Sequence, residues 1–127
     1  MSSFGLDSNQ SHWQEISDGV RADFSNHQVE IFSDGTWQDA ILTKTELAVF
    51  RILVERSGRP VGRNQIIDFV ERERDSEDED ETMTERSFEM HISRLRPKLA
   101  RAVGDPVSIR AVQGIRYRLV TLNQERP

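Results

Sequence analysis

The stretch 82–100 reads TMTERSFEMHISRLRPKLA and has its apolar residues at helical spacing. Thr82 and Glu85 have the spacing of a capping box, in which each side chain accepts a backbone N–H of the other residue. We therefore expect a helix that starts after Thr82. One apolar stripe of this helix would be buried in the core. It consists of Phe88, Ile92, Leu95 and Leu99.

The opposite side of this helix is polar and basic. Successive residues are about 100° apart, so the residues opposite the stripe can be read from the sequence. They are Arg86, Met90, Ser93 and Pro97, flanked by Glu89 and Arg94. Pro97 has no N–H for the Ser93 carbonyl and its ring clashes with that group, so the helix is expected to kink or end near Pro97.

Two further helices are predicted upstream. Thr43 and Glu46 form a second capping box, so the first helix would start after Thr43, and Gly58 would stop it. The second helix is expected at about 63–72. Before them, turn signals separate four short strand-like pieces, at 13–16, 20–23, 28–32 and 37–42. Trp13 and Trp37 are expected to pack on this antiparallel sheet.

The chain ends in a predicted β-hairpin. Val107, Ile109 and Ala111 alternate with polar residues, Gln113-Gly114 turns the chain, and the strand around Tyr117 and Leu119 returns. The fold class is therefore α+β: an N-terminal antiparallel sheet, three helices and a C-terminal hairpin. Residues 13–122 would form one domain between tails at 1–12 and 123–127.

Charge is distributed unevenly along the chain. The net charge is −5, but residues 71–85 carry nine acidic and two basic residues, whereas residues 86–127 carry nine basic and three acidic ones. The like-charge block at 71–82 is expected to be a solvated loop. Because the local field decides whether a phosphate backbone is attracted, the basic C-terminal third is compatible with nucleic acid binding.

Composition excludes several classes of protein. There is no cysteine, hence no disulfide or thiolate metal site, and no apolar run reaches the roughly 20 residues of a membrane helix. We expect a cytoplasmic protein without membrane contact. No metal site or other cofactor is predicted, since His12, His27 and His91 lie on separate elements. No nucleophile motif surrounds a serine, so the chain is not expected to be an enzyme.

The order of elements and three motifs resemble the winged helix-turn-helix effector domain of OmpR/PhoB-type bacterial response regulators. The stretch 86–96, RSFEMHISRLR, is similar to the recognition-helix pattern of that family. Residues 42–47, LTKTEL, resemble the opening of its first helix, and residues 112–118, VQGIRYR, resemble its wing. The resemblance covers about residues 13–122. Twelve residues before it are too few for a receiver domain, so a stand-alone effector domain is expected.

This resemblance implies a sequence-specific DNA-binding transcription regulator. Its third helix would lie in the major groove of double-stranded DNA, and its wing on the adjacent backbone or minor groove. The residues implied in DNA contact are Arg86, Glu89, His91, Ser93, Arg94, Arg96, Arg116 and Arg118. Alternatives stay open: His91 as a half-buried packing residue, Glu89 as an ion-pair partner of Arg86 or Arg96.

Further partners are expected from the same resemblance. A single small domain should bind DNA weakly, so a second copy or another DNA-bound regulator would add affinity. The resemblance also implies that the loop between the second and third helices is a contact surface for RNA polymerase. The partner-binding residues would then be Asp75, Glu77, Asp78, Glu79, Asp80 and Glu81. The alternative functions are a winged-helix protein-interaction module and an autoinhibited DNA binder, both of which would use this acidic loop.

Replacing those six acidic residues by serine and glycine tests the electrostatic influence of the loop. Carboxylates close to the third helix repel phosphate within about 8–10 Å, so the variant should bind non-specific DNA several-fold more tightly at low salt. The gain should shrink as salt rises, in a fluorescence anisotropy titration. Equal affinities at low salt would argue against autoinhibition.

Overall fold

The computed structural model describes residues 12–73, 85–101, 106–113 and 115–121. Its first part is an antiparallel sheet in the order β1-β2-β3-β4. The strands are β1 (Gln14–Ser17), β2 (Val20–Asp23), β3 (Gln28–Ser33) and β4 (Thr36–Asp39), with the 3-10 turn η1 (Phe24–Asn26) between β2 and β3. The N-terminal sheet predicted from the turn signals is therefore confirmed.

Three helices and a second sheet follow. The helices are α2 (Lys44–Glu55), α3 (Arg63–Glu73) and α4 (Glu85–Ala100). The second sheet has the order β5-β7-β6 and consists of β5 (Val61–Gly62), β6 (Val107–Val112) and β7 (Arg116–Thr121). None of the helices among the described residues is long and apolar enough to cross a membrane.

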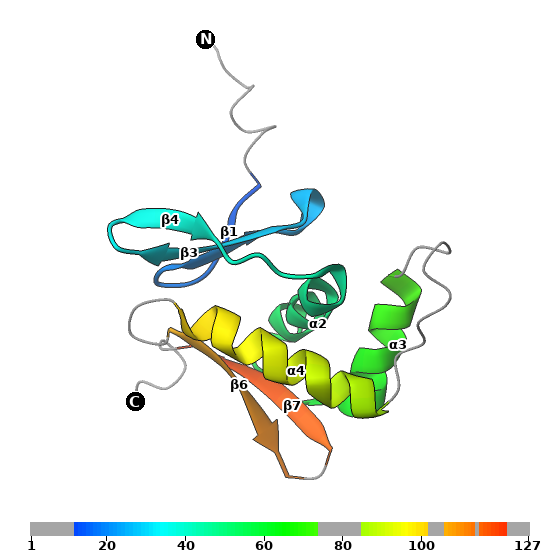
Figure 1. Ribbon diagram of the computed structural model, residues 1–127. Coiled ribbons are helices and arrows are strands. Elements are labelled where there is room, and N and C mark those ends of the chain that lie inside the picture. The colour runs from blue at the N-terminus through cyan, green and yellow to red at the C-terminus, as the bar shows by residue number, and fades with distance from the viewer. Residues whose placement is uncertain (1–11, 74–84, 102–105, 114, 122–127) are drawn as a thin grey trace.

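Helix α2 lies at the centre of the molecule. Figure 1 shows it between the β1–β4 sheet and helix α4, with α3 at one end of α4 and the β6–β7 hairpin on the far side of α4. Residues from all these layers share one apolar core, among them Ile31 of the sheet, Phe50 of α2 and Leu95 of α4. The ring of Phe24 also tilts against Phe50, at 6.2 Å between centroids. One core thus fixes α4 and the hairpin against the rest of the fold.

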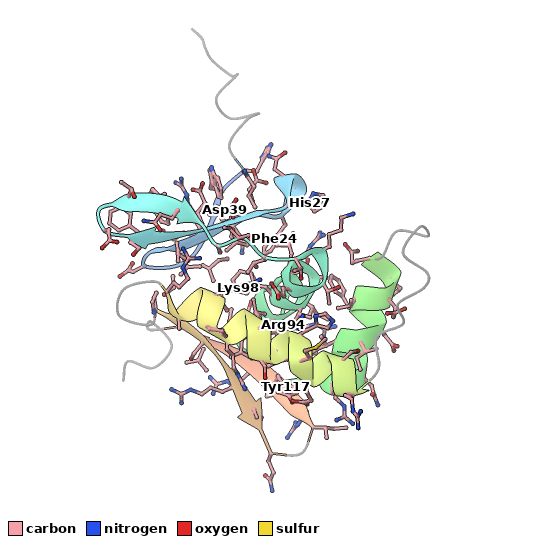
Figure 2. The ribbon with its side chains drawn as sticks, in the orientation of Figure 1. Phe24, His27, Asp39, Arg94, Lys98 and Tyr117 are labelled. Carbon is pink, nitrogen blue, oxygen red and sulfur yellow. The ribbon has the colours of Figure 1, made fainter. Side chains whose placement is uncertain are left out.

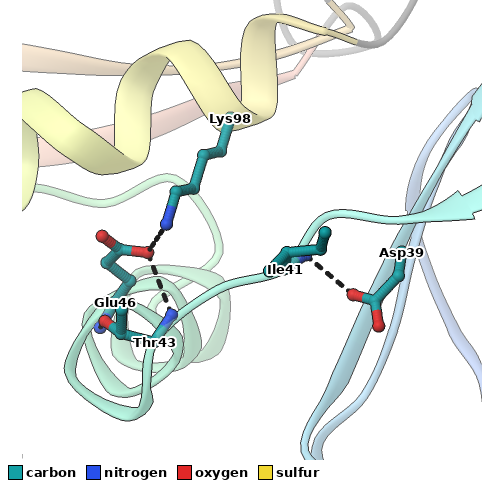
Figure 3. A network of polar contacts seen from close by, with 5 residues as sticks. All are labelled: Asp39, Ile41, Thr43, Glu46 and Lys98. Carbon is teal, nitrogen blue, oxygen red and sulfur yellow. Dashed lines mark hydrogen bonds and ion pairs between the residues drawn. The ribbon is translucent and has the colours of Figure 1, made fainter.

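The capping box of α2 is confirmed, and its glutamate also contacts another helix. The Thr43 hydroxyl accepts the Glu46 N–H at 3.1 Å, and Glu46 Oε1 accepts the Thr43 N–H at 3.0 Å. The same Oε1 accepts a hydrogen bond from Lys98 Nζ of α4 at 2.6 Å (Figure 3). Glu46 is only 1% exposed. The buried carboxylate therefore joins the start of α2 to the last turn of α4.

On the outer face of the N-terminal sheet, an arginine stacks against two tryptophans, a contact that the sequence does not predict. The guanidinium of Arg21 lies between two indole rings, 4.4 Å from the Trp13 centroid and 4.1 Å from that of Trp37. Arg21 Nη2 also pairs with Glu30 Oε1 at 2.6 Å. Both tryptophans lie on the sheet, as expected, but they stack on a cation rather than only on apolar neighbours.

Several predicted boundaries were wrong. The strand expected at 37–42 ends at Asp39, because Asp39 Oδ1 accepts the Ile41 N–H at 2.7 Å and Ile41 turns the chain with a φ of 57° (Figure 3). The loop expected at 71–82 starts later, because α3 continues to Glu73. Pro97 does not end α4, which continues to Ala100. The tails and residues 74–84, including Thr82, lie outside the described residues.

Substitution of Lys98 by methionine tests the bond between α4 and α2. The Glu46 carboxylate would stay buried and lose its positive partner, so the free energy of unfolding should fall by about 1.5–3 kcal/mol. Lys44→Met is the matched control, because Lys44 is an exposed lysine in the first turn of α2. It should change stability by less than about 0.5 kcal/mol. Equal changes in urea unfolding for both variants would show that the Lys98–Glu46 bond contributes nothing.

Candidate nucleic-acid interface

Helix α4 has one buried face and one exposed face, as its periodicity predicts. Phe88 and Leu95 are 0% exposed, and Ile92 and Leu99 are 1% exposed. On the other side, Arg86, Met90, Ser93, Arg94 and Pro97 are exposed. Figure 2 labels Arg94 near the middle of α4 and Lys98 nearer its C-terminal end. Burial of the stripe leaves two arginines and a serine free to meet a partner along this face.

The β6–β7 hairpin presents a second basic surface beside α4. The strands pair in register from Val107 opposite Thr121 to Val112 opposite Arg116. Val107, Ile109, Tyr117 and Leu119 are buried, which anchors the hairpin in the core. Arg110 and Arg116 are exposed, and Arg116 Nε donates to the Gln113 carbonyl at 3.4 Å near the turn. The predicted wing therefore exists and carries arginines outside the core.

Side-chain hydrogen bonds join α4 to this hairpin. Arg96 Nε donates to the Ile109 carbonyl of β6 at 3.2 Å. The Tyr117 hydroxyl of β7 donates to Glu89 Oε2 at 2.7 Å. The ring of Tyr117 meets that of Phe88 edge to face, with 5.3 Å between the centroids. Burial, together with the hydrogen bond to Glu89 and the charge of Glu89, raises the pKa of Tyr117 above its usual 10.0.

The hairpin is also fastened to the link between α2 and α3. Arg118 Nε donates to the Gly58 carbonyl at 3.1 Å. Strand β5 pairs with β7, with Val61 opposite Tyr117, and the Arg63 N–H at the start of α3 donates to the Ile115 carbonyl at 2.7 Å. The wing is thus held on both sides rather than projecting alone.

The predicted DNA-contact residues fall into two groups. Arg86, Ser93, Arg94 and Arg116 expose their side chains on α4 or the wing. Glu89 and Arg96 are exposed as well, but they hydrogen-bond the hairpin, whereas Arg118 and His91 are half-buried and each makes an interaction within the protein. The six acidic residues expected to bind a partner lie outside the described residues.

Sequence reasoning missed the main polar contacts of the site. Glu89 accepts a hydrogen bond from the Tyr117 hydroxyl, a partner that its sequence neighbours do not indicate. Tyr117 belongs to the wing pattern, and its hydroxyl has no local signal because Glu89 is 28 residues away. Met90, 41% exposed, is an apolar side chain on the otherwise polar outer face of α4. A helical projection places Met90 there but does not give it a role.

The chemistry of this surface suits an anionic partner with hydrogen-bonding edges. Guanidinium groups pair well with phosphate oxygens, and a carboxylate or hydroxyl can bond base edges. Within the described part of the chain, no group of three or more His, Asp or Glu side chains could hold a metal ion.

Comparison with known proteins identifies related chains. Protein PetR of Rhodobacter capsulatus is 33% identical over 82 residues, which is 65% of this chain but only 34% of PetR, so the chain spans about a third of that relative. A crystal structure of the response regulator AdeR DNA-binding domain in complex with an intercistronic region superposes with a TM-score of 0.62. At 22% identity it covers 80% of this chain and 93% of that one. This likeness confirms the predicted α+β winged helix-turn-helix fold.

The family match is direct. The profile of the family described as "Transcriptional regulatory protein, C terminal" matches residues 38–119, which are more than half of the chain. This range begins in β4 and ends in β7, so it contains α2, α3, α4 and the wing. The resemblance to OmpR/PhoB-type effector domains is thereby confirmed, and the chain belongs to the family of C-terminal domains of transcriptional regulatory proteins.

Proposed function

We propose that this chain binds double-stranded DNA in a sequence-specific manner and regulates transcription. Helix α4 would lie in the major groove, and the β6–β7 wing would contact the adjacent backbone or minor groove. The observation that carries the proposal is the exposed face of α4, where Arg86, Ser93 and Arg94 lie opposite a fully buried stripe. The AdeR domain, which shares the fold, was crystallised with DNA.

The dimensions of α4 fit this placement. Its 16 residues span about 24 Å, and the major groove is about 12 Å wide, enough to admit a helix. Arginines of α4 and the wing would neutralise phosphates and supply affinity, and side chains of α4 that reach base edges would supply specificity. The bonds from α4 to the wing would keep the two contact surfaces at a fixed distance.

Partners beyond DNA follow from the size of the domain. One such domain makes a small interface, so a second copy or another regulator on neighbouring DNA would raise the affinity. A contact of the acidic residues at 75–81 with RNA polymerase stays a prediction, because these residues lie outside the described ones. The protein-interaction module and the autoinhibited binder depend on the same segment.

Substitution of Arg94 by alanine tests the groove helix. Because Arg94 points away from the apolar stripe, the loss should weaken binding to a selected duplex by about 1–3 kcal/mol and leave the thermal midpoint nearly unchanged. Arg72→Ala removes an exposed arginine from the last turn of α3 and is the matched control, expected to change affinity little. Unchanged affinity of folded Arg94→Ala in fluorescence anisotropy would remove Arg94 from the interface.

Substitution of Arg116 by alanine tests the wing. If its guanidinium meets a phosphate, the variant should bind all sequences more weakly, and the slope of log affinity against log salt should become shallower by about 0.9. Arg116→Lys keeps the charge and should retain the wild-type slope. Identical slopes for wild type and Arg116→Ala would show that the wing does not contact the backbone through this residue.

A further inference from the structure

The Tyr117–Glu89 hydrogen bond joins a core residue of the wing to a surface residue of the groove helix. Tyr117 is 8% exposed, and its ring is held edge to face by the fully buried Phe88. Its hydroxyl reaches Glu89 Oε2 at 2.7 Å. Figure 2 shows Tyr117 where β7 passes the helix that carries Arg94. The buried Tyr117 side chain therefore restricts the position of the exposed Glu89 carboxylate.

This hydrogen bond occupies one of the two carboxylate oxygens of Glu89. Oε2 accepts the Tyr117 hydrogen, and Glu89 is exposed, so its carboxylate offers Oε1 as a second acceptor. Glutamate loses much rotamer freedom when its side chain is ordered, so a free glutamate would lose that freedom on binding a ligand. Because Tyr117 already restricts Glu89, a contact made through Oε1 would cost less conformational entropy.

The carboxylate sits on a surface that otherwise suits DNA. It repels phosphates, so a bond to the backbone is unfavourable for Glu89. An ionised carboxylate is an acceptor only, and its donors in the major groove are the amino groups of cytosine and adenine. Adenine places the acceptor N7 beside its amino group, which repels a carboxylate. Cytosine has no acceptor on its own major-groove edge and is the better partner.

We propose that Tyr117 is a positioning residue for base reading, which holds Glu89 so that Oε1 accepts a hydrogen bond from a cytosine amino group. This assignment rests on the proposed function of α4 as the groove helix. It makes the wing part of the specificity of α4 as well as a contact surface of its own. A phenol is protonated at neutral pH, so Tyr117 can donate this hydrogen bond.

The test compares four versions of the 127-residue chain: wild type, Glu89→Gln, Tyr117→Phe and Phe88→Leu. Duplexes selected by wild type from a random pool identify the base pair whose preference depends on Glu89, and anisotropy gives affinities for the C·G and T·A versions. We expect wild type to favour C·G by about tenfold and Glu89→Gln to lose that preference. Tyr117→Phe should reduce it about threefold or more, while the other positions of the site keep their base ranking.

The controls separate positioning from packing and from the proposed function itself. Phe88→Leu loosens the same cluster but keeps the hydroxyl, so it should keep the C·G preference; an equal loss there would overturn the positioning role. Full preference in folded Tyr117→Phe would also overturn it, with the proposed function intact. If wild type enriches no sequence, the proposed function and the inference both fail.

A second variant covers the case in which Tyr117→Phe does not fold. Glu89→Asp shortens a surface side chain by one methylene, so its carboxylate cannot reach the phenol and the base together. It should lose the C·G preference about as fully as Glu89→Gln. Retention of the wild-type preference in Glu89→Asp would contradict the proposal.

Discussion

Burial of the stripe Phe88, Ile92, Leu95 and Leu99 determines which side chains of α4 face outward. All four are at most 1% exposed, so the rotation of the helix about its axis is set by the core. A shift of one residue would rotate the helix by about 100° and carry charged side chains toward the apolar interior, where an unpaired charge is very unfavourable. The exposed position of Arg86 and Arg94 is thus a consequence of packing, and the proposed DNA surface depends on it.

Hydrogen bonds fix the orientation of α4 more narrowly than apolar packing alone can. Hydrophobic burial has no direction, whereas a hydrogen bond fixes distance and orientation. Helix α4 has such bonds along its length: Glu89 to Tyr117, Arg96 to the Ile109 carbonyl, and Lys98 to Glu46. The first two join α4 to the wing and the third joins it to α2. Together they hold α4 and the wing in one geometry, which the proposed two-part contact with DNA would need.

The elements that the sequence predicted well are those with local signals. Spacing located the stripe of α4, and Thr43 with Glu46 located the start of α2. Long-range bonds have no such signal. Arg96 and Arg118 match family positions for DNA contact, yet each donates to a backbone carbonyl, 13 and 60 residues away respectively. Strand β5 has only two residues and exists through its pairing with β7, so its own composition could not reveal it.

In the proposed complex, α4 and the wing form the DNA-binding surface, and the β1–β4 sheet lies on the opposite side of α2 (Figure 1). An NMR titration of the isotope-labelled chain with a selected duplex tests this placement. Amide shifts should concentrate in α4, around Arg94, and in the β6–β7 hairpin, around Arg116. Shifts confined to the β1–β4 sheet, around Arg21 and Trp37, would contradict it.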